Sequence, residues 1–377
     1  MSSRKQLRIG MVGFGSMGKT HAYAIRNLPY YFSSLPFSAE VCAICTTSPE
    51  RSARLANEYG LGTPVTSFDE LLSRDDVDII DICTPNILHC DMICRALDAG
   101  KHVLCEKPLC VTPDEAARIV EAERQSGRIC GMVFNNRFMA PMLRAKQLID
   151  EGRLGRILSF RVTYEHNSST FPDKAPGWKQ TAAAGGGVLF DLGSHVIDLV
   201  RHLCGDFESV QGMSQIAFPS HGDWQTDADE AFYITARLKS GACGTIVANK
   251  LATGVNDDLS LAIFGERGSI KYELMEPEWL YFYDNDRPAS PIGGERGFTR
   301  IECGGRYPAP GGSFPSPKAS VGWLRCHIES MVQYLSAVAN GTPFSPSLYD
   351  GAYVQAVMQA ALESDRNGGT RREVITP

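Results

Sequence analysis

The chain has 377 residues, which is too long for one compact core, so two domains are expected. It carries 37 lysines and arginines against 43 aspartates and glutamates, a formal net charge of -6, and neither sign forms a block. This balance argues against non-specific binding to nucleic acid or to an anionic membrane.

The first residues leave no room for a signal peptide, because residues 1–5 lead directly into an apolar run. No apolar stretch approaches the roughly 18 residues that a membrane-spanning helix needs. We therefore expect a cytoplasmic protein that does not enter a membrane.

Twelve cysteines are present, and most lie inside apolar runs, as Cys83, Cys94 and Cys130 do. Cys42 and Cys45 have the spacing of a redox or metal pair, but no second pair follows at zinc-finger spacing. Residues three apart in a strand also point to opposite faces. We expect buried, reduced thiols and no metal site.

Residues 7–137 alternate short apolar runs with amphipathic helices, the pattern of a parallel sheet covered on both faces. Thr112 and Glu115 frame a capping box at one helix start, with Pro113 in the first turn. We therefore expect an α/β domain over residues 1–137. Its expected strands are 7–12, 40–45, 78–83, 102–105 and 129–134, and its expected helices are 19–28, 49–59, 89–99 and 113–125.

The alternation of strands and helices stops after an expected helix at 139–151. Several later runs alternate apolar and polar residues with few helices between them, which predicts a largely antiparallel sheet. We expect an α+β domain with an open sheet over residues 138–377, closed by helices that could pack back on the first domain. The expected strands are 157–164, 210–218, 231–238, 244–250, 259–264 and 280–283, and the closing helices are 321–340 and 349–367.

Two segments without a clear strand or helix pattern each allow more than one interpretation. Residues 284–319 are rich in Gly, Pro and Ser, and a loop that long acts as a lid, serves as an oligomer arm or is disordered. An aromatic loop is expected before the second strand, as a contact surface or as local packing, with local packing favoured. Its residues are Tyr30, Tyr31, Phe32 and Phe37.

A glycine-rich turn follows the first expected strand and opens the first expected helix. Glycines permit a tight turn and close backbone approach, and a helix start offers free N–H groups to a phosphate. This context predicts that the turn binds a dinucleotide pyrophosphate in a Rossmann domain. The turn is Gly13-Phe14-Gly15-Ser16-Met17-Gly18.

A second motif, Glu106-Lys107-Pro108, stands at the end of the fourth expected strand. A lysine between cofactor and substrate can stabilise alkoxide character, and burial can lower its pKa enough for it to share a proton transfer. Pro108 cannot continue the strand ladder, so it fixes this turn. Glu106 is expected to pair with Lys107 or to line the cofactor site.

Three consecutive glycines, Gly185 to Gly187, precede an expected helix. Glycine is unfavourable there unless another group approaches closely. At about 100° per residue, leucines and valine fall on one face, and the opposite face carries acids and imidazoles in place of the usual Lys and Glu. The residues of that polar face are Asp191, His195, Asp198 and His202.

This face suits hydride transfer from a secondary alcohol, which needs a base for the hydroxyl proton. A histidine has a pKa near 6.5 and suits that task at neutral pH, so His195 is the candidate base. Asp191 is expected to orient the substrate or tune His195. Asp198 is a weaker substrate candidate, and His202 is expected to be structural.

The order of these motifs, with Thr84-Pro85-Asn86-x-x-His89 between the first two, resembles the glucose–fructose oxidoreductase / inositol dehydrogenase (Gfo/Idh/MocA) family. The resemblance runs from about residue 7 to the C-terminal helices. It implies a Rossmann domain, an open mixed or antiparallel sheet whose face supports a homodimer or homotetramer, and NAD(P)-dependent redox chemistry on sugars, inositols or related polyols.

Carried over by position, Lys107 is the family's motif lysine, Asp191 its helix aspartate and His195 its proton-transfer residue. Trp178-Lys179 occupies the place of a family Trp-Arg near the cofactor, where lysine loses the bidentate fork. The resemblance also implies cofactor contacts from the Thr84 to His89 segment and from Glu106. Expected substrate-pocket residues are Tyr164, His166, Trp178 and Asp198.

NAD enzymes usually end the second strand with an acid that binds the adenosine ribose. Here Thr46 stands at that position, followed by Thr47 and, five residues after Thr46, by Arg51. Hydroxyls and a guanidinium would accept a 2′-phosphate that a carboxylate repels, so NADP is favoured over NAD. Arg54 could take the place of Arg51.

Two alternatives to a dehydrogenase or reductase stay open at this point. An enzyme that keeps its cofactor bound and recycles it, like the glycosidases and epimerase-like enzymes similar to this family, would use the same residues. A ligand sensor on the same fold is disfavoured by the presence of both Lys107 and His195.

Overall fold

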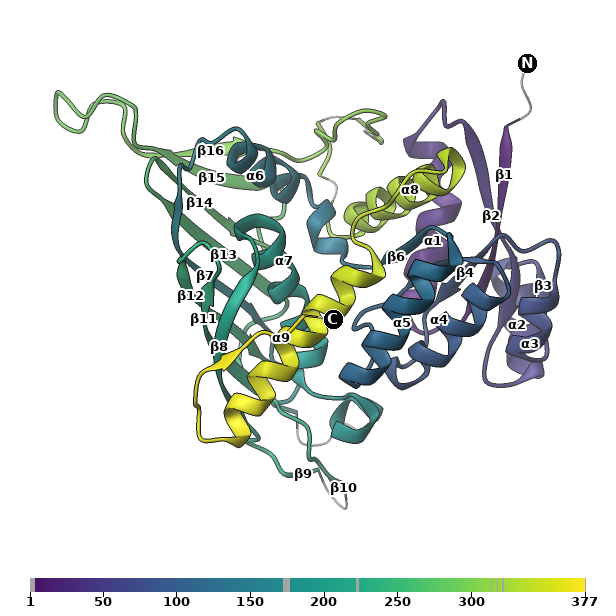
Figure 1. Ribbon diagram of the computed structural model, residues 1–377. Coiled ribbons are helices and arrows are strands. Elements are labelled where there is room, and N and C mark those ends of the chain that lie inside the picture. Colours follow the sequence, from purple (N-terminus) through teal and green to yellow (C-terminus); the bar gives the residue numbers. More distant parts are fainter. Residues whose placement is uncertain are drawn as a thin grey trace.

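The computed structural model describes residues 4–171, 177–221, 224–312, 314–316, 318–320 and 322–376. Two sheets lie side by side, and the closing helices α8 (Leu324–Asn340) and α9 (Leu348–Arg366) lie between them (Figure 1). Val321, the expected first residue of the penultimate helix, lies outside the described residues.

The N-terminal sheet is parallel throughout, with the strand order β3-β2-β1-β4-β5-β6. All five expected strands are present, and the expected Rossmann fold is confirmed. Parallel strands place their carboxyl ends at one edge, where such folds bind ligands. The strands are β1 (Lys5–Val12), β2 (Phe37–Cys45), β3 (Thr63–Pro64), β4 (Ile79–Ile82), β5 (His102–Cys105) and β6 (Cys130–Met132).

Helices cover both faces of this sheet (Figure 1). The capping box at the start of α5 is present, with Thr112 Oγ1 accepting from the Glu115 amide at 3.3 Å. The short helix α3 was not expected. The helices are α1 (Ser16–Tyr31), α2 (Pro49–Tyr59), α3 (Phe68–Ser73), α4 (His89–Asp98) after a 3₁₀ turn η1 (Asn86–Leu88), and α5 (Pro113–Ser126).

Helix α1 continues three residues past its expected end, so the expectation of an aromatic loop is wrong for Tyr30 and Tyr31. Pro29 lies in the last turns without ending the helix. The rings pack locally: Tyr31 lies 5.6 Å from Phe314, and the Arg325 guanidinium lies 5.2 Å over Tyr31. These contacts join α1 to the start of α8.

The second sheet has nine strands in the order β16-β15-β14-β13-β7-β12-β11-β8-β17. Neighbouring strands are antiparallel except for β7 and β12, so the expected open, largely antiparallel sheet is confirmed. The strands are β7 (Ile157–Glu165), β8 (Phe207–Gln215), β11 (Ala231–Leu238), β12 (Cys243–Asn249), β13 (Asp258–Gly265), β14 (Gly268–Glu273), β15 (Trp279–Asp284), β16 (Phe298–Glu302) and β17 (Arg372–Glu373), with a separate small hairpin of β9 (Ser220–His221) and β10 (Trp224–Gln225).

Strand β16 corrects the expectation for residues 284–319, because this segment is not a structureless loop. Phe298 pairs with Tyr283 across the ladder, and their rings lie 5.5 Å apart. Residues 285–297 form the long hairpin connection that projects from the edge of the sheet in Figure 1. Strands β14 and β17 were also missed.

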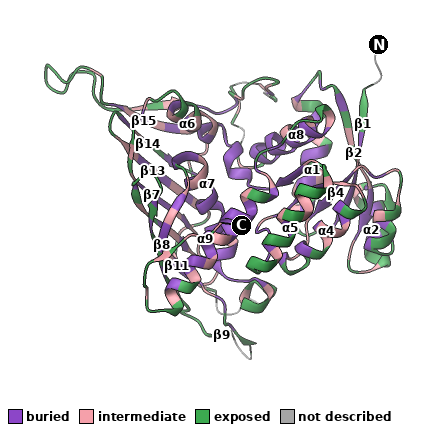
Figure 2. Ribbon diagram, viewed as in Figure 1, coloured by how far each residue is buried: buried purple, intermediate pink, exposed green. Residues whose placement is uncertain are grey.

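One face of the larger sheet is covered by helices α6 (Ala140–Asp150), α7 (Ser194–Cys204) and α9 (Figure 1). Figure 2 shows α7 and most of α8 as buried, whereas α4 and α5 expose their outer sides. The helical stretch Ala182–Cys204 is long and apolar enough to cross a bilayer, but 83% of its most apolar window is buried inside the protein. It is a core helix.

The two closing helices contact the first domain. The Lys5 Nζ donates to the carbonyl oxygen of Val338 in α8 at 3.2 Å. The Gln355 amide in α9 donates to the carbonyl oxygen of Val111 at 3.1 Å. The division into residues 1–137 and 138–377 is a prediction about folding units, and the closing helices bridge its two parts.

A buried ion pair lies at the junction of the two sheets. Arg137, in the 3₁₀ turn η2 (Asn135–Phe138), donates to both carboxylate oxygens of Asp198 in α7, at 2.7 and 2.5 Å. Their side chains are 6% and 1% exposed, and Asp350 of α9 lies 3.7 Å from the same guanidinium. The pair therefore ties three elements together away from water.

Asp198→Asn is expected to lower the free energy of unfolding by about 3 kcal/mol, because it leaves the buried Arg137 guanidinium with Asp350, which lies 3.7 Å away and also binds Arg201. The matched control is Asp206→Asn, whose carboxylate pairs with Arg201 but is 42% exposed; we expect a loss of about 0–1 kcal/mol. Urea denaturation measures both. A change in substrate KM without loss of stability would contradict the structural role of Asp198.

Candidate active site

A cleft of about 720 Å³ lies at the carboxyl edge of the parallel sheet, between the two domains. Most of the site residues expected from sequence line it. These are Gly13, Phe14, Gly15, Ser16, Met17, Thr46, Thr47, Arg51, Thr84, Pro85, Asn86, Glu106, Lys107, Trp178, Lys179 and Asp191.

The glycine turn has the geometry that a diphosphate requires. Gly13 has φ +87°, and a Cβ there would lie 2.5 Å from the Cys83 carbonyl oxygen. Gly18 lets α1 approach, because its Cβ would lie 2.7 Å from the Gly13 carbonyl oxygen. A Cβ at Gly15 would meet no atom within 4 Å, and the first turn of α1 carries no acid. This open, acid-free helix start fits an NAD(P) pyrophosphate.

At the end of β2 the hydroxyl of Thr46 is already engaged. It donates to the Ser48 carbonyl oxygen at 3.3 Å and lies 3.1 Å from the Ser52 hydroxyl. Thr47 and Arg51 therefore carry the polar groups that face the cleft. Arg54 instead pairs with Glu58 at 3.0 Å along the exposed side of α2.

Glu106 lines the cleft, but both of its oxygens are occupied by the protein. One lies 3.0 Å from His21 Nε2, and the other accepts from the Lys107 amide at 3.1 Å. The other nitrogen of His21 lies 2.9 Å from the Asp81 carboxylate. Burial alone would lower the pKa of His21, but Asp81 raises it well above its usual value, so an imidazolium joins two carboxylates beneath the cleft.

Lys107 crosses from the first domain to the second. Its Nζ donates to the Asp191 carbonyl oxygen at 2.6 Å and to Asp191 Oδ1 at 3.1 Å. Burial lowers the pKa of Lys107, although the Asp191 carboxylate opposes this shift. The ammonium is thus held at the domain interface and deprotonates more readily than a free lysine.

Two further lysines bind the same carboxylate. Lys179 Nζ lies 3.0 and 2.9 Å from the two Asp191 oxygens, and Lys250 Nζ lies 2.8 Å from Oδ2. Burial alone would raise the pKa of Asp191, but Lys250, Lys107 and Lys179 together hold it well below its usual value. Asp191 is therefore a carboxylate at neutral pH.

The glycines before Asp191 are required by close contacts. A Cβ on Gly185 would collide with the Asn86 side chain, one on Gly186 would lie 2.5 Å from the Lys179 carbonyl oxygen, and one on Gly187 would collide with Asp229. Asn86 also donates to the Gly185 carbonyl oxygen at 2.9 Å, which ties this segment to the first domain.

Asp191 lies in a π-helical turn, η5 (Leu189–Gly193), that leads into α7. The expectation of a regular α-helix with one polar face is therefore wrong, since the wider turn shifts the phase and both faces are largely buried. Asp229 supports the turn by accepting from the Leu189 amide at 2.8 Å. Such turns are frequent at functional sites.

His195 lies beneath the cleft, one turn after Asp191. Its ring is 5.9 Å from Tyr164 and 6.4 Å from Phe134, and its Nδ1 is buried without a hydrogen-bond partner among the described residues. Burial and the nearby Lys107 ammonium hold the pKa of His195 well below its usual value. The imidazole is therefore neutral at neutral pH and can accept a proton.

Two residues expected in the site lie elsewhere. His89 is buried, with its ring nitrogens 2.9 Å from the carbonyl oxygens of Pro108 and Thr84, so it braces the cleft wall and does not face the cofactor. Asp198 is bound on both oxygens by Arg137, so it is not available to a substrate. His202 is half-buried, and this partial removal from water lowers its pKa to about 3.

Of the remaining substrate candidates, Tyr164 packs against His195 and Trp178 lines the cleft. Tyr164 is 6% exposed and hydrogen-bonds to Asp257, and His166 follows β7, with its amide bound to the Asn249 carbonyl oxygen at 2.9 Å. All twelve cysteines, including Cys42 and Cys45, are free. His21, Asp81 and Cys83 place ligand-type atoms within 4.8 Å of one another, but His21 is already bonded to Asp81 there.

Sequence reasoning missed the residues that act through partners distant in the chain. Lys250 ends a strand, and Asp229 precedes one, in positions that gave no motif signal. His21 could have been identified from the sequence, because it lies on the helix that follows the glycine turn. Asp81 was an acid inside a buried strand, which is a signal for a buried partner.

Two family models match the chain. The NAD-binding Rossmann fold of an oxidoreductase family matches residues 7–134, and the GFO/IDH/MocA C-terminal domain matches residues 142–271. The chain is 31% identical to levoglucosan dehydrogenase of Pseudarthrobacter phenanthrenivorans, with 96% of each chain covered. It is 27% identical to glucose-6-phosphate 3-dehydrogenase of Bacillus subtilis, with 96% of this chain and 97% of the relative covered.

Among solved structures, levoglucosan dehydrogenase in complex with NADH and levoglucosan superposes with a TM-score of 0.94 at 30% identity, over 98% of this chain and 100% of the other. The expected dinucleotide-binding domain, the open-sheet domain and the oxidoreductase activity are confirmed by these matches. The chain belongs to the Gfo/Idh/MocA oxidoreductase family.

Proposed function

We propose that this protein is an NAD(P)-dependent dehydrogenase or reductase that acts on a secondary alcohol or the corresponding ketone of a sugar, an inositol or a related polyol. The observation that carries the proposal is that Lys107, in the wall of the cleft that fits the cofactor, binds Asp191 and lies close enough to the buried His195 to lower its pKa. The dehydrogenase names of the full-length relatives support it.

The three residues divide the chemistry. A nicotinamide cofactor held in the cleft would supply the hydride acceptor for the carbinol carbon. His195, held neutral by burial, is proposed to accept the hydroxyl proton. Lys107 donates to the substrate oxygen as it gains alkoxide character, and Asp191 fixes the ammonium at the domain interface. Tyr164, His166 and Trp178 are proposed to bound the substrate pocket.

The two alternatives considered from sequence gain no support. The relatives reported above are dehydrogenases, which favours net oxidation or reduction over internal recycling of the cofactor. A cytoplasmic location is part of the proposal, since twelve free thiols suit a reducing compartment.

We further propose NADP as the preferred cofactor. The end of β2 offers no carboxylate to a ribose hydroxyl, and the Thr47 hydroxyl and the Arg51 guanidinium are positioned for a 2′-phosphate. Thr46 contributes less than the sequence indicates, because Ser48 and Ser52 already bind its hydroxyl.

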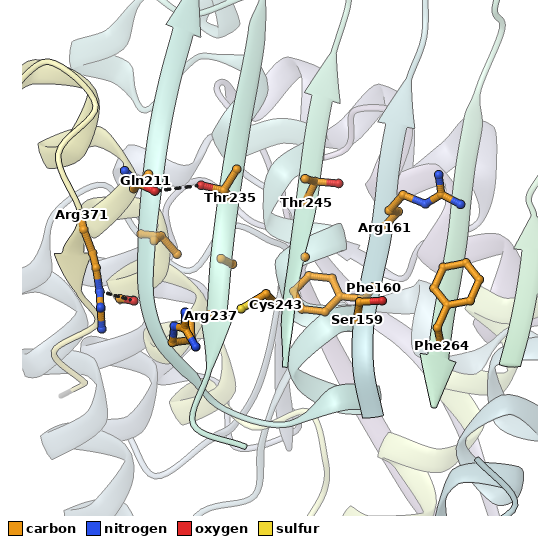
Figure 3. Close-up of a pocket in the computed structure, with 14 residues that line it drawn as sticks. Ser159, Phe160, Arg161, Gln211, Thr235, Arg237, Cys243, Thr245, Phe264 and Arg371 are labelled. Carbon is orange, nitrogen blue, oxygen red and sulfur yellow. Dashed lines mark hydrogen bonds between the residues drawn. The ribbon is translucent and has the colours of Figure 1, made fainter. Parts of the chain in front are cut away.

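The protein is also proposed to form a homodimer or homotetramer through the outer face of the nine-stranded sheet. Figure 3 shows Gln211, Thr235, Thr245 and Arg161 in one row across four strands of this face, and all four side chains are exposed. A hollow of about 640 Å³ lies on the face. A broad, uncovered sheet face of this kind suits two-fold packing against a second copy.

Lys107→Met is expected to lower kcat by about 10²- to 10⁴-fold, because the neutral side chain cannot stabilise the alkoxide. NAD(P)H binding, followed by quenching of protein fluorescence, should stay within about threefold of wild type. Turnover is scored by absorbance of the reduced cofactor with a panel of polyols and keto-sugars. Normal turnover by the variant would remove Lys107 from the mechanism.

Arg51→Ala should reduce the preference for NADP over NAD, measured as the ratio of kcat/KM values, by roughly 10- to 100-fold, the worth of one charge-assisted bond. Arg54→Ala is the matched control from the same helix, since its guanidinium pairs with Glu58. Its ratio should equal that of wild type. A wild-type enzyme that prefers NAD would contradict the cofactor proposal.

Light scattering should give the wild-type protein a mass of two or four times 41.2 kDa. Thr245→Arg places like charges on both copies at the centre of the proposed interface, so the variant should dissociate. Cys243, exposed on the same face, should then react faster with thiol reagents. Gln125→Arg on α5 is the control. A wild-type mass of one chain would overturn the assembly.

A further inference from the structure

Lys250 is the most enclosed of the three lysines around Asp191. Its side chain is 8% exposed, compared with 14% for Lys107 and 47% for Lys179. No motif in the sequence pointed to it, and the proposed mechanism does not use it. A buried ammonium beside the central carboxylate of a site requires a reason.

The backbone holds Lys250 in place from both sides. Its amide donates to the Glu230 carbonyl oxygen at 2.8 Å, and its own carbonyl oxygen accepts from the Ser169 amide at 3.0 Å. The residue therefore extends β12 in a fixed position. Its Nζ lies 2.8 Å from Oδ2 of Asp191, within the second domain, whereas Lys107 comes from the first domain and binds Oδ1.

The two buried lysines bind different oxygens of the carboxylate. Lys107 takes Oδ1 and the backbone carbonyl of Asp191, whereas Lys250 takes Oδ2. Lys107 must give up part of its contact with Asp191 when it turns to a substrate oxygen. If Lys250 were missing, this movement would leave the Asp191 carboxylate without an enclosed cation. A buried carboxylate in that state is strongly destabilised. Lys179 is half exposed, so water and salt weaken its contribution.

We infer that Lys250 is a positioning residue that holds Asp191 ionised and in place, so that Lys107 is free to bind the substrate oxygen. This inference rests on the proposed dehydrogenase function, because it assigns Lys250 a task within that reaction. Lys250 does not touch the reacting atoms. It acts through Asp191.

The charge environment fixes the sign of the expected effect. Burial raises the pKa of Asp191, and the surrounding lysines lower it. Without Lys250 fewer cations oppose the effect of burial, so the pKa of Asp191 rises. Below that raised pKa the carboxyl carries a proton and no longer holds Lys107, so activity is lost at low pH and returns as the pH rises. The titratable groups that face Asp191 are Lys107, Lys179, Lys250, His195, Tyr164 and Asp257.

The test measures kcat and kcat/KM across about pH 5 to 9 for Lys250→Met. We expect the acid limb to move upward by about one pH unit or more and kcat at low pH to fall at least tenfold. Lys250→Arg keeps the charge and should restore the limb. Lys239→Met, which removes a lysine that is 59% exposed near Asp206, is the matched control and should match wild type.

An infrared difference spectrum provides a readout that does not depend on turnover. Lys250→Met should show the band of a protonated, buried carboxyl at a pH where wild type shows none. The band should be absent in the double variant Lys250→Met/Asp191→Asn, which assigns it to Asp191. If Lys250→Met does not fold, Lys250→Gln removes the charge while keeping a hydrogen-bond donor.

A uniform loss of kcat with an unmoved acid limb and no carboxyl band would overturn the inference, because a merely structural role predicts that result. Unchanged kinetics in Lys250→Met would overturn it as well. Normal turnover in Lys107→Met would instead contradict the proposed function. The two failures are therefore distinguishable.

Discussion

The contact between Lys107 and Asp191 is the interaction on which the site depends. Lys107 stands at the carboxyl edge of the parallel sheet, and Asp191 lies in a helical turn of the second domain, 84 residues later. Their contact fixes the distance between the cofactor cleft and the imidazole of His195. The rest of the structure supports the two ends: the His21 imidazolium secures Glu106 beside Lys107, and Asp229 secures the turn that carries Asp191.

The surroundings of Asp191 and His195 give these two residues different charge states. Three lysines meet around Asp191 and keep this carboxyl ionised, while burial and the Lys107 ammonium keep His195 neutral. At neutral pH the aspartate is thus ionised and the histidine one helical turn away is neutral. Their different surroundings let one site hold a fixed charge and a proton acceptor at the same pH.

The sequence allowed the Rossmann domain, the open sheet and most of the cleft to be predicted, because local patterns determine them. Gly13 and Gly15 predict the turn, and the spacing of the apolar residues predicts the strands. Strand β16 was missed, since Gly, Pro and Ser surround it and only pairing with β15 makes it a strand. His89 and Asp198 were misplaced, because their chemistry suits a site, and only the fold shows which partners already bind them.

Lys250 illustrates why the remaining part could not be predicted. Its amide and carbonyl oxygen are fixed by backbone hydrogen bonds, just beyond the end of β12, to residues 20 and 81 positions away, at Glu230 and Ser169. Register of this kind is set by the whole sheet and leaves no trace in the residues next to Lys250. The glycines at 185–187 differ, because their number alone signals crowding. What crowds them, the side chains of Asn86 and Asp229 and the backbone of Lys179, is again decided by the fold. Residues that contact the cofactor are therefore recognised from local patterns, and residues that hold them in place are recognised from the structure.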